Sequence, residues 1–127
     1  MKDLFFVNKD MLKTFSEIKE YVKTSTGNIG TNITLINIPL EKGYVYEVYT
    51  ITRQGISTNS GINSNIVGNN CICYDDSTRG TGVNGGGVVN IAIVRVENDN
   101  ASVDCNTYVF ENTDYSCYAR VRKIGIV

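Results

Sequence analysis

Residues 115–122, with the sequence YSCYARVR, alternate between small or apolar side chains and polar or aromatic ones. Cys117, Ala119 and Val121 fall on one side of an extended chain, and the intervening serine, tyrosine and arginines fall on the other. A period of two is typical of a strand that buries one face. We therefore expect an amphipathic strand here, whose outer face is either solvated or an interface.

The same period recurs along most of the chain after Asn28, with turn residues between the runs. Residues 88–96, VVNIAIVRV, are apolar on both faces, which is typical of a central strand or of one covered by another subunit. Strands are expected at residues 33–38, 44–52, 62–67, 71–74, 88–97, 103–110 and 115–127, the last with an interruption at Gly125. Short strands without intervening helices predict an all-β fold, a jelly roll or β-sandwich.

One short α-helix is expected before these strands, because Asn8 is a suitable N-cap and Gly27 with Asn28 provides a stop signal. Its apolar residues form a heptad seam: Met11, Phe15, Ile18 and Val22. This seam fits a surface helix packed on its own domain, or a neck that associates with copies of itself. Because two heptads are too short to be stable alone, a neck at residues 1–27 would depend on a head at residues 28–127.

Composition excludes several classes of function. A chain of 127 residues builds one core, and a formal net charge of −1 without a basic run argues against a nucleic-acid partner. The apolar runs are too short to span a membrane, and the N-terminus does not resemble a signal peptide. The chain has no histidine, so it lacks the commonest general base and zinc ligand, and we expect no enzyme.

A glycine-rich segment, DDSTRGTGVNGGGVV at residues 75–89, contains the spacing G-x-G-x-x-G at Gly80, Gly82 and Gly85. In nucleotide-binding proteins these glycines lead into a helix whose N-terminus faces the phosphates. Here they lead into the β-branched run after Gly87. The segment is therefore interpreted as a loop, and no cofactor is expected.

The cysteines and acidic residues do not form a recognisable site. Cys71 and Cys73 lie in one apparent strand, whereas Cys105 and Cys117 are isolated, so zinc-ligand spacing is missing. A Cys105–Cys117 disulfide is possible if residues 111–114 form a hairpin, but reduced, buried thiols are favoured. Asp75 and Asp76 are adjacent in a strand and cannot both reach one glycosidic bond. No catalytic residue and no metal is expected.

Binding is most plausible in the irregular region between Thr52 and Val88, because long loops in compact β domains tend to be functional. Tyrosine beside Asn, Asp and Arg offers a flat ring together with hydrogen-bonding groups. The candidate ligand-binding residues are Tyr74, Asp75, Asp76, Arg79 and Asn84.

The order of these parts resembles bacteriophage fibre proteins. The similarity rests on FVNKDMLKTFSEIKEYV at residues 6–22, a polar spacer, ITLINIPLEKGYVYEVYTI at residues 33–51, and the terminal YSCYARVRKIGIV. The resemblance implies a virion structural protein, a homotrimer with a jelly-roll head that projects outward and can attach to a host surface glycan. The short leader suits a head fibre, capsid decoration or small tip protein.

The resemblance also suggests a role for the apolar leader, Leu4, Phe5, Phe6 and Val7, as a plug into another virion protein, although it could equally pack on its own head. The alternative function is a stand-alone carbohydrate-binding or lectin-like β-sandwich module. A trimer would favour the fibre, and a monomer would favour the module.

Overall fold

The computed structural model describes residues 9–55, 62–78 and 87–127. The helix α1 spans Lys9–Ser16. The strands are β1 (Ile18–Ser25), β2 (Asn32–Leu40), β3 (Tyr44–Gln54), β4 (Asn63–Asn69), β5 (Ile72–Thr78), β6 (Gly87–Arg95), β7 (Ala101–Tyr108) and β8 (Tyr115–Ile126). The expectation of an all-β sandwich with one short helix is confirmed for this part of the chain.

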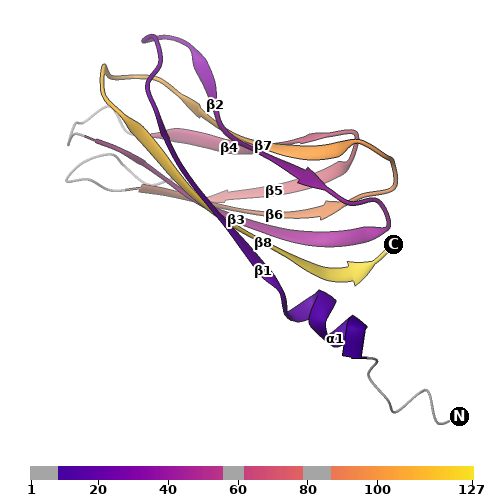
Figure 1. The fold of residues 1–127 in the computed structure, drawn as a ribbon. Coiled ribbons are helices and arrows are strands. Elements are labelled where there is room, and N and C mark those ends of the chain that lie inside the picture. The colour runs from indigo at the N-terminus through magenta and orange to yellow at the C-terminus, as the bar shows by residue number, and fades with distance from the viewer. Residues whose placement is uncertain (1–8, 56–61, 79–86) are drawn as a thin grey trace, which may run out of the picture.

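The strands form two layers that pack face to face (Figure 1). The large sheet has the order β1-β8-β3-β6-β5, and the small sheet has the order β2-β7-β4. β1 pairs with β8, β2 with β7 and β3 with β6, all antiparallel, which is the nested pairing of a long hairpin rolled into two sheets. This order agrees with the jelly-roll expectation, except that β5 joins the large sheet through β6.

The predicted strands all form, with ends that differ by a few residues. Cys117, Ala119 and Val121 of β8 are buried, as their alternation indicates. β6 lies inside the large sheet between β3 and β5, which agrees with its two apolar faces. The predicted interruption at Gly125 is wrong for β8 itself, which continues to Ile126. The pairing is irregular beside Gly125, because β8 has one extra residue, Ile124, between Gly125 and Lys123, which face the consecutive residues Val45 and Tyr46 of β3.

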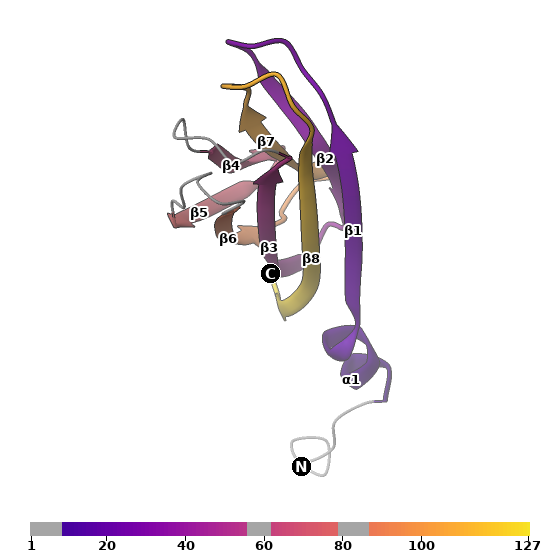
Figure 2. The same cartoon turned by 90° about the vertical axis from the view of Figure 1, so that its left-hand side faces the viewer.

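The predicted extent of the helix is wrong. α1 ends at Ser16, and residues 18–25 form β1, which pairs along its whole length with β8 at one edge of the large sheet (Figure 2). Ile18 and Val22 therefore do not continue a helical seam from Met11 and Phe15. A spacing of four residues fits one face of a strand as well as one turn of a helix, and pairing with β8 decides between them.

The hairpin at residues 111–114 that a Cys105–Cys117 disulfide would have required does not form, because β7 and β8 belong to different sheets. The segment crosses from one layer to the other, and Tyr115 holds it in place. The Tyr115 hydroxyl is buried and accepts hydrogen bonds from the backbone N–H groups of Phe110 and Glu111, each at 3.1 Å.

The core between the sheets is apolar at one end and polar at the other. Val48, Val94 and Val103 are fully buried in the apolar part. The polar part lies towards the end of β3. There the Ser64 hydroxyl forms a hydrogen bond with the Thr52 hydroxyl at 3.0 Å and donates to the Asn106 backbone carbonyl at 2.9 Å. The bond to Thr52 ties the large sheet to the small one through polar groups, and the bond to Asn106 lies within the small sheet.

Candidate functional site

The outer face of the large sheet carries apolar side chains on all five of its strands. Pairing across the sheet aligns Ile18, Arg122, Glu47, Ile93 and Tyr74 in one row. The neighbouring row contains Glu20, Arg120, Tyr49 and Ile91. The row beyond it contains Val22, Tyr118, Ile51 and Val89. We define the apolar face as Ile18, Val22, Tyr118, Tyr49, Ile51, Val89, Ile91, Ile93, Ile72 and Tyr74.

Much of this apolar face is open to solvent. Val22 is 74% exposed, Tyr74 64% and Ile18 49%, and Ile91 and Ile93 are also exposed in the middle of the sheet. Single exposed apolar residues are ordinary, whereas exposed isoleucines and tyrosines that recur across a whole sheet are typical of interaction surfaces.

Two of the charged side chains on this outer face, Arg122 and Arg120, have partners within it. The Arg122 guanidinium donates to both carboxylate oxygens of Glu47, at 3.1 and 3.3 Å. The Arg120 guanidinium lies 4.9 Å from the centroid of the Tyr49 ring, within cation–π range. Glu20 lies beside Arg120 in the same row, so the face also carries charge between its apolar rows.

The outer face of the small sheet has the opposite character. We define the polar face as Asn32, Thr34, Asn37 and Pro39 of β2, Ser102, Asp104, Asn106 and Tyr108 of β7, and Asn63, Asn65, Val67 and Asn69 of β4. Most of these residues carry an amide, a hydroxyl or a carboxylate. β7 lies in the middle, so its side chains are flanked by amides from both neighbouring strands.

The polar face contains a hydrogen-bonded cluster centred on β7. The Asn37 amide donates to Asp104 Oδ1 at 2.6 Å and to the Ser102 hydroxyl at 3.2 Å. From the other side, the Asn69 amide donates to Asp104 Oδ2 and to the same Ser102 hydroxyl, both at 3.1 Å. The two amides are therefore held by shared acceptors on the central strand.

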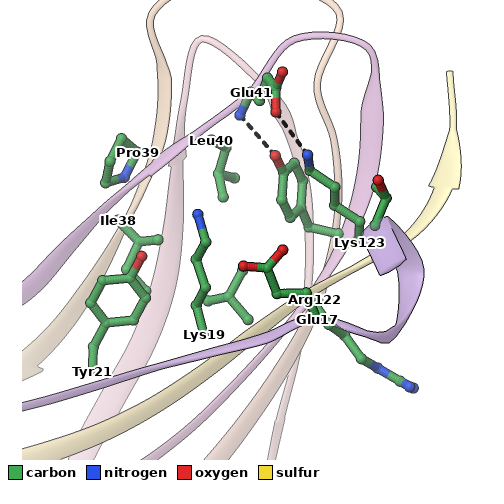
Figure 3. Close-up of a pocket in the computed structure, with 12 residues that line it drawn as sticks. Glu17, Lys19, Tyr21, Ile38, Pro39, Leu40, Glu41, Arg122 and Lys123 are labelled. Atoms are coloured by element: carbon green, nitrogen blue, oxygen red, sulfur yellow. Dashed lines mark hydrogen bonds and ion pairs between the residues drawn. The ribbon is translucent and has the colours of Figure 1, made fainter. Parts of the chain in front are cut away.

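A cavity of about 140 Å³ opens at the edge of the sandwich between α1, β1 and the end of β2 (Figure 3). Several polar groups around it are already paired. Tyr46 accepts a hydrogen bond from the Glu41 N–H at 2.9 Å, and Lys123 pairs with the Glu41 carboxylate at 2.7 Å. The cavity is smaller than ordinary ligand pockets of about 300–1,000 Å³.

The predicted ligand-binding residues are only partly covered by the structure. Tyr74 lies on the apolar face, strongly exposed. Asp75 and Asp76 are consecutive residues of the edge strand β5. Arg79 and Asn84, like the G-x-G-x-x-G glycines, lie outside the described residues. The strand that follows the glycines is β6, as predicted.

The residues predicted for oligomerisation fall into two places. Met11 and Phe15 lie on α1, whereas Ile18 and Val22 lie on β1 and belong to the apolar face. The predicted anchor residues Leu4, Phe5, Phe6 and Val7 lie outside the described residues. The alternation of side chains along each strand shows which residues point outward. Together with the strand order, it would have revealed the apolar face and the polar face.

The four cysteines are free thiols. Cys105 and Cys117 are buried, as expected of small core residues. The hydrogen bond with Cys117 is the main cause that raises the pKa of the Cys105 thiol, and burial is the second. Among the described residues, no group of His, Cys, Asp and Glu side chains is arranged to hold a metal ion.

Within residues 9–55, 62–78 and 87–127, no helix has the length and apolar character needed to cross a bilayer. In comparisons with known proteins, the chain matches no family model, and no curated protein or solved structure is significantly similar to it.

Proposed function

We propose that this chain is a non-enzymatic structural protein that assembles with copies of itself through the apolar face. The observation that carries this proposal is the set of exposed apolar side chains that recurs on all five strands of the outer side of the large sheet. Such a surface exposes β-branched and aromatic side chains to water at a free-energy cost unless another surface covers it.

The size of the apolar face is adequate for a stable interface. Strands about 4.8 Å apart and about eight residues long give the face a flat area of roughly 600 Å². Side-chain relief increases the accessible area beyond that value, towards the ~800 Å² per partner of standard interfaces. A second copy of the chain presents the same area.

The charges of the apolar face favour a second copy over a strongly charged partner. Arg122 is neutralised by Glu47, and Arg120 lies against the Tyr49 ring. The face carries both signs of charge, Glu20 and Glu47 beside Arg120 and Arg122, so two copies can approach without a large net repulsion.

The resemblance to bacteriophage fibre proteins supplies the biological setting of the proposal. In that setting the chain is a homotrimeric head fibre, tail fibre or decoration protein in the virion. It is attached through its N-terminus to other virion proteins and carries a jelly-roll head that binds a host surface glycan. The apolar face would lie between subunits, and the polar face would face outward.

The solution mass of the full chain, measured by light scattering, tests the assembly proposal. The chain has a mass of 14.0 kDa, and we expect three times this value at micromolar concentration. A mass of 14.0 kDa that persists on concentration would refute the proposal.

The alternative function is a stand-alone carbohydrate-binding or lectin-like module. The amide-rich polar face favours this alternative, because amides and carboxylates are suitable partners for sugar hydroxyls. A module would be a monomer that binds glycan, whereas a fibre would bind glycan as an oligomer. The solution mass separates the two.

A further inference from the structure

We infer that the polar face of the small sheet, centred on Asn37, Asn69, Ser102 and Asp104, is a binding platform for an uncharged oligosaccharide. This inference names a site for the glycan-binding part of the proposed function and rests on that part. It does not depend on self-assembly through the apolar face.

The hydrogen bonds of the cluster leave defined groups for a ligand. Both N–H groups of the Asn37 amide are used within the cluster, and so are both of Asn69. Among the described residues, no hydrogen bond reaches the carbonyl oxygen of either amide. Asp104 and Ser102 therefore orient two amide acceptors, which suit the hydroxyl donors of a sugar.

The orientation of these amides is fixed before a ligand binds. Asp104 uses one carboxylate oxygen for each amide, and Ser102 accepts from both. A second bond of this kind lies further along the face, where Thr34 donates to Asn106 Oδ1 at 2.9 Å. Preorganised polar groups lose less side-chain entropy when a ligand binds.

The charge of the polar face points to a neutral ligand. Asp104 is the one carboxylate among its members, and none of them is a lysine or an arginine. Without a cation, the face has no partner for a sialic acid, a phosphate or a sulfate. A lone carboxylate would also repel an anionic sugar.

An aromatic pair lies at one end of the polar face. The rings of Tyr108 and Phe110 are tilted against each other with centroids 4.7 Å apart, and Phe110 is 37% exposed. Tyr108 pairs with Asn32 on one side and Asn63 on the other, so its ring is surrounded by amides. Apolar ring faces beside amides suit a sugar, which has apolar C–H faces and polar edges.

The dimensions of the platform fit a short oligosaccharide. From Ser102 to Tyr108 the face extends about 20 Å along β7, and its three strands span about 10 Å across. A second copy of the chain is a poorer occupant, because it would bury many amides and hydroxyls that need partners.

The test is binding of the fluorescently labelled full chain to a printed array. The array carries neutral gluco-, galacto- and manno-oligosaccharides beside sialylated and phosphorylated ones. We expect binding to at least one neutral class. The double variant Asn37→Ala/Asn69→Ala and the single variant Tyr108→Ala should each weaken this binding about tenfold or more. Asn98→Ala, an exposed amide in the turn after β6, is the matched control and should change binding less than about twofold.

Thermal unfolding of each variant verifies that it folds. If the double variant does not fold, Tyr108→Ala alone provides the binding test. Binding only to anionic sugars, binding to none, or neutral binding unchanged in these variants would each overturn the inference. An oligomer that binds no sugar would leave the assembly proposal standing. A monomer that binds neutral sugars through this face would refute assembly and retain the inference.

Discussion

At the scale of single residues, Tyr115 explains how the chain changes sheets between β7 and β8. Its hydroxyl lies in the core and accepts two backbone N–H bonds from the crossing segment. The sequence allowed a hairpin here, because turn residues look alike whether the next strand joins the same sheet or the opposite one. The hydrogen bonds of the buried Tyr115 hydroxyl hold the segment in the conformation that crosses to the other sheet.

We predict that Tyr115→Phe lowers the free energy of unfolding by about 1–3 kcal/mol, because two backbone N–H groups lose their acceptor. Urea unfolding of the variant and of Tyr74→Phe, an exposed tyrosine, provides the measurement and its control. Equal stability of the two variants would show that the crossing does not depend on this hydroxyl.

The cysteines allow a second prediction at this scale. Cys105 and Cys117 are fully buried, whereas Cys71 and Cys73 are half-buried near the surface. We expect iodoacetamide at pH 8 to modify Cys73 much faster than Cys105 in the folded protein, because the reagent must reach the sulfur. Peptide mass spectrometry gives the order of labelling, and equal rates would contradict the packing of the core.

At the scale of elements, the strands were predictable and the first element was not. Alternation and apolar runs identified β2 to β8, because most of these strands bury alternate side chains. In residues 18–25, only Tyr21 packs against the core, so alternation gives little signal. Ile18 and Val22 then fitted a heptad, and only the pairing with β8 reveals the strand.

This correction leads to a prediction about truncation. A chain lacking residues 1–16 keeps β1 and the apolar face, so it should fold and keep its oligomeric mass. A chain lacking residues 1–27 also loses β1 and the buried contacts of Tyr21, and should unfold at least about 2 kcal/mol more easily. Light scattering and urea unfolding of both chains check this. If the chain lacking residues 1–16 did not assemble, that result would support a helical neck instead.

At the scale of the whole molecule, the two outer faces of the sandwich differ in chemistry. The large sheet presents isoleucines and tyrosines, and the small sheet presents amides and hydroxyls. The sequence contained both sets of residues, but their grouping depends on the strand order. The order places β6 beside β5 and β7 beside β4, and short-range patterns do not contain that information.

The comparison of Ile93→Lys with Val67→Lys tests the central claim most directly. Both side chains are 38% exposed on an outer sheet face, Ile93 on the apolar face and Val67 on the polar face. Light scattering should show that Ile93→Lys dissociates to the 14.0 kDa monomer while Val67→Lys keeps the oligomeric mass of the unmodified chain. If Ile93→Lys keeps that mass, or if both variants dissociate, the apolar face is not the surface through which the chain assembles.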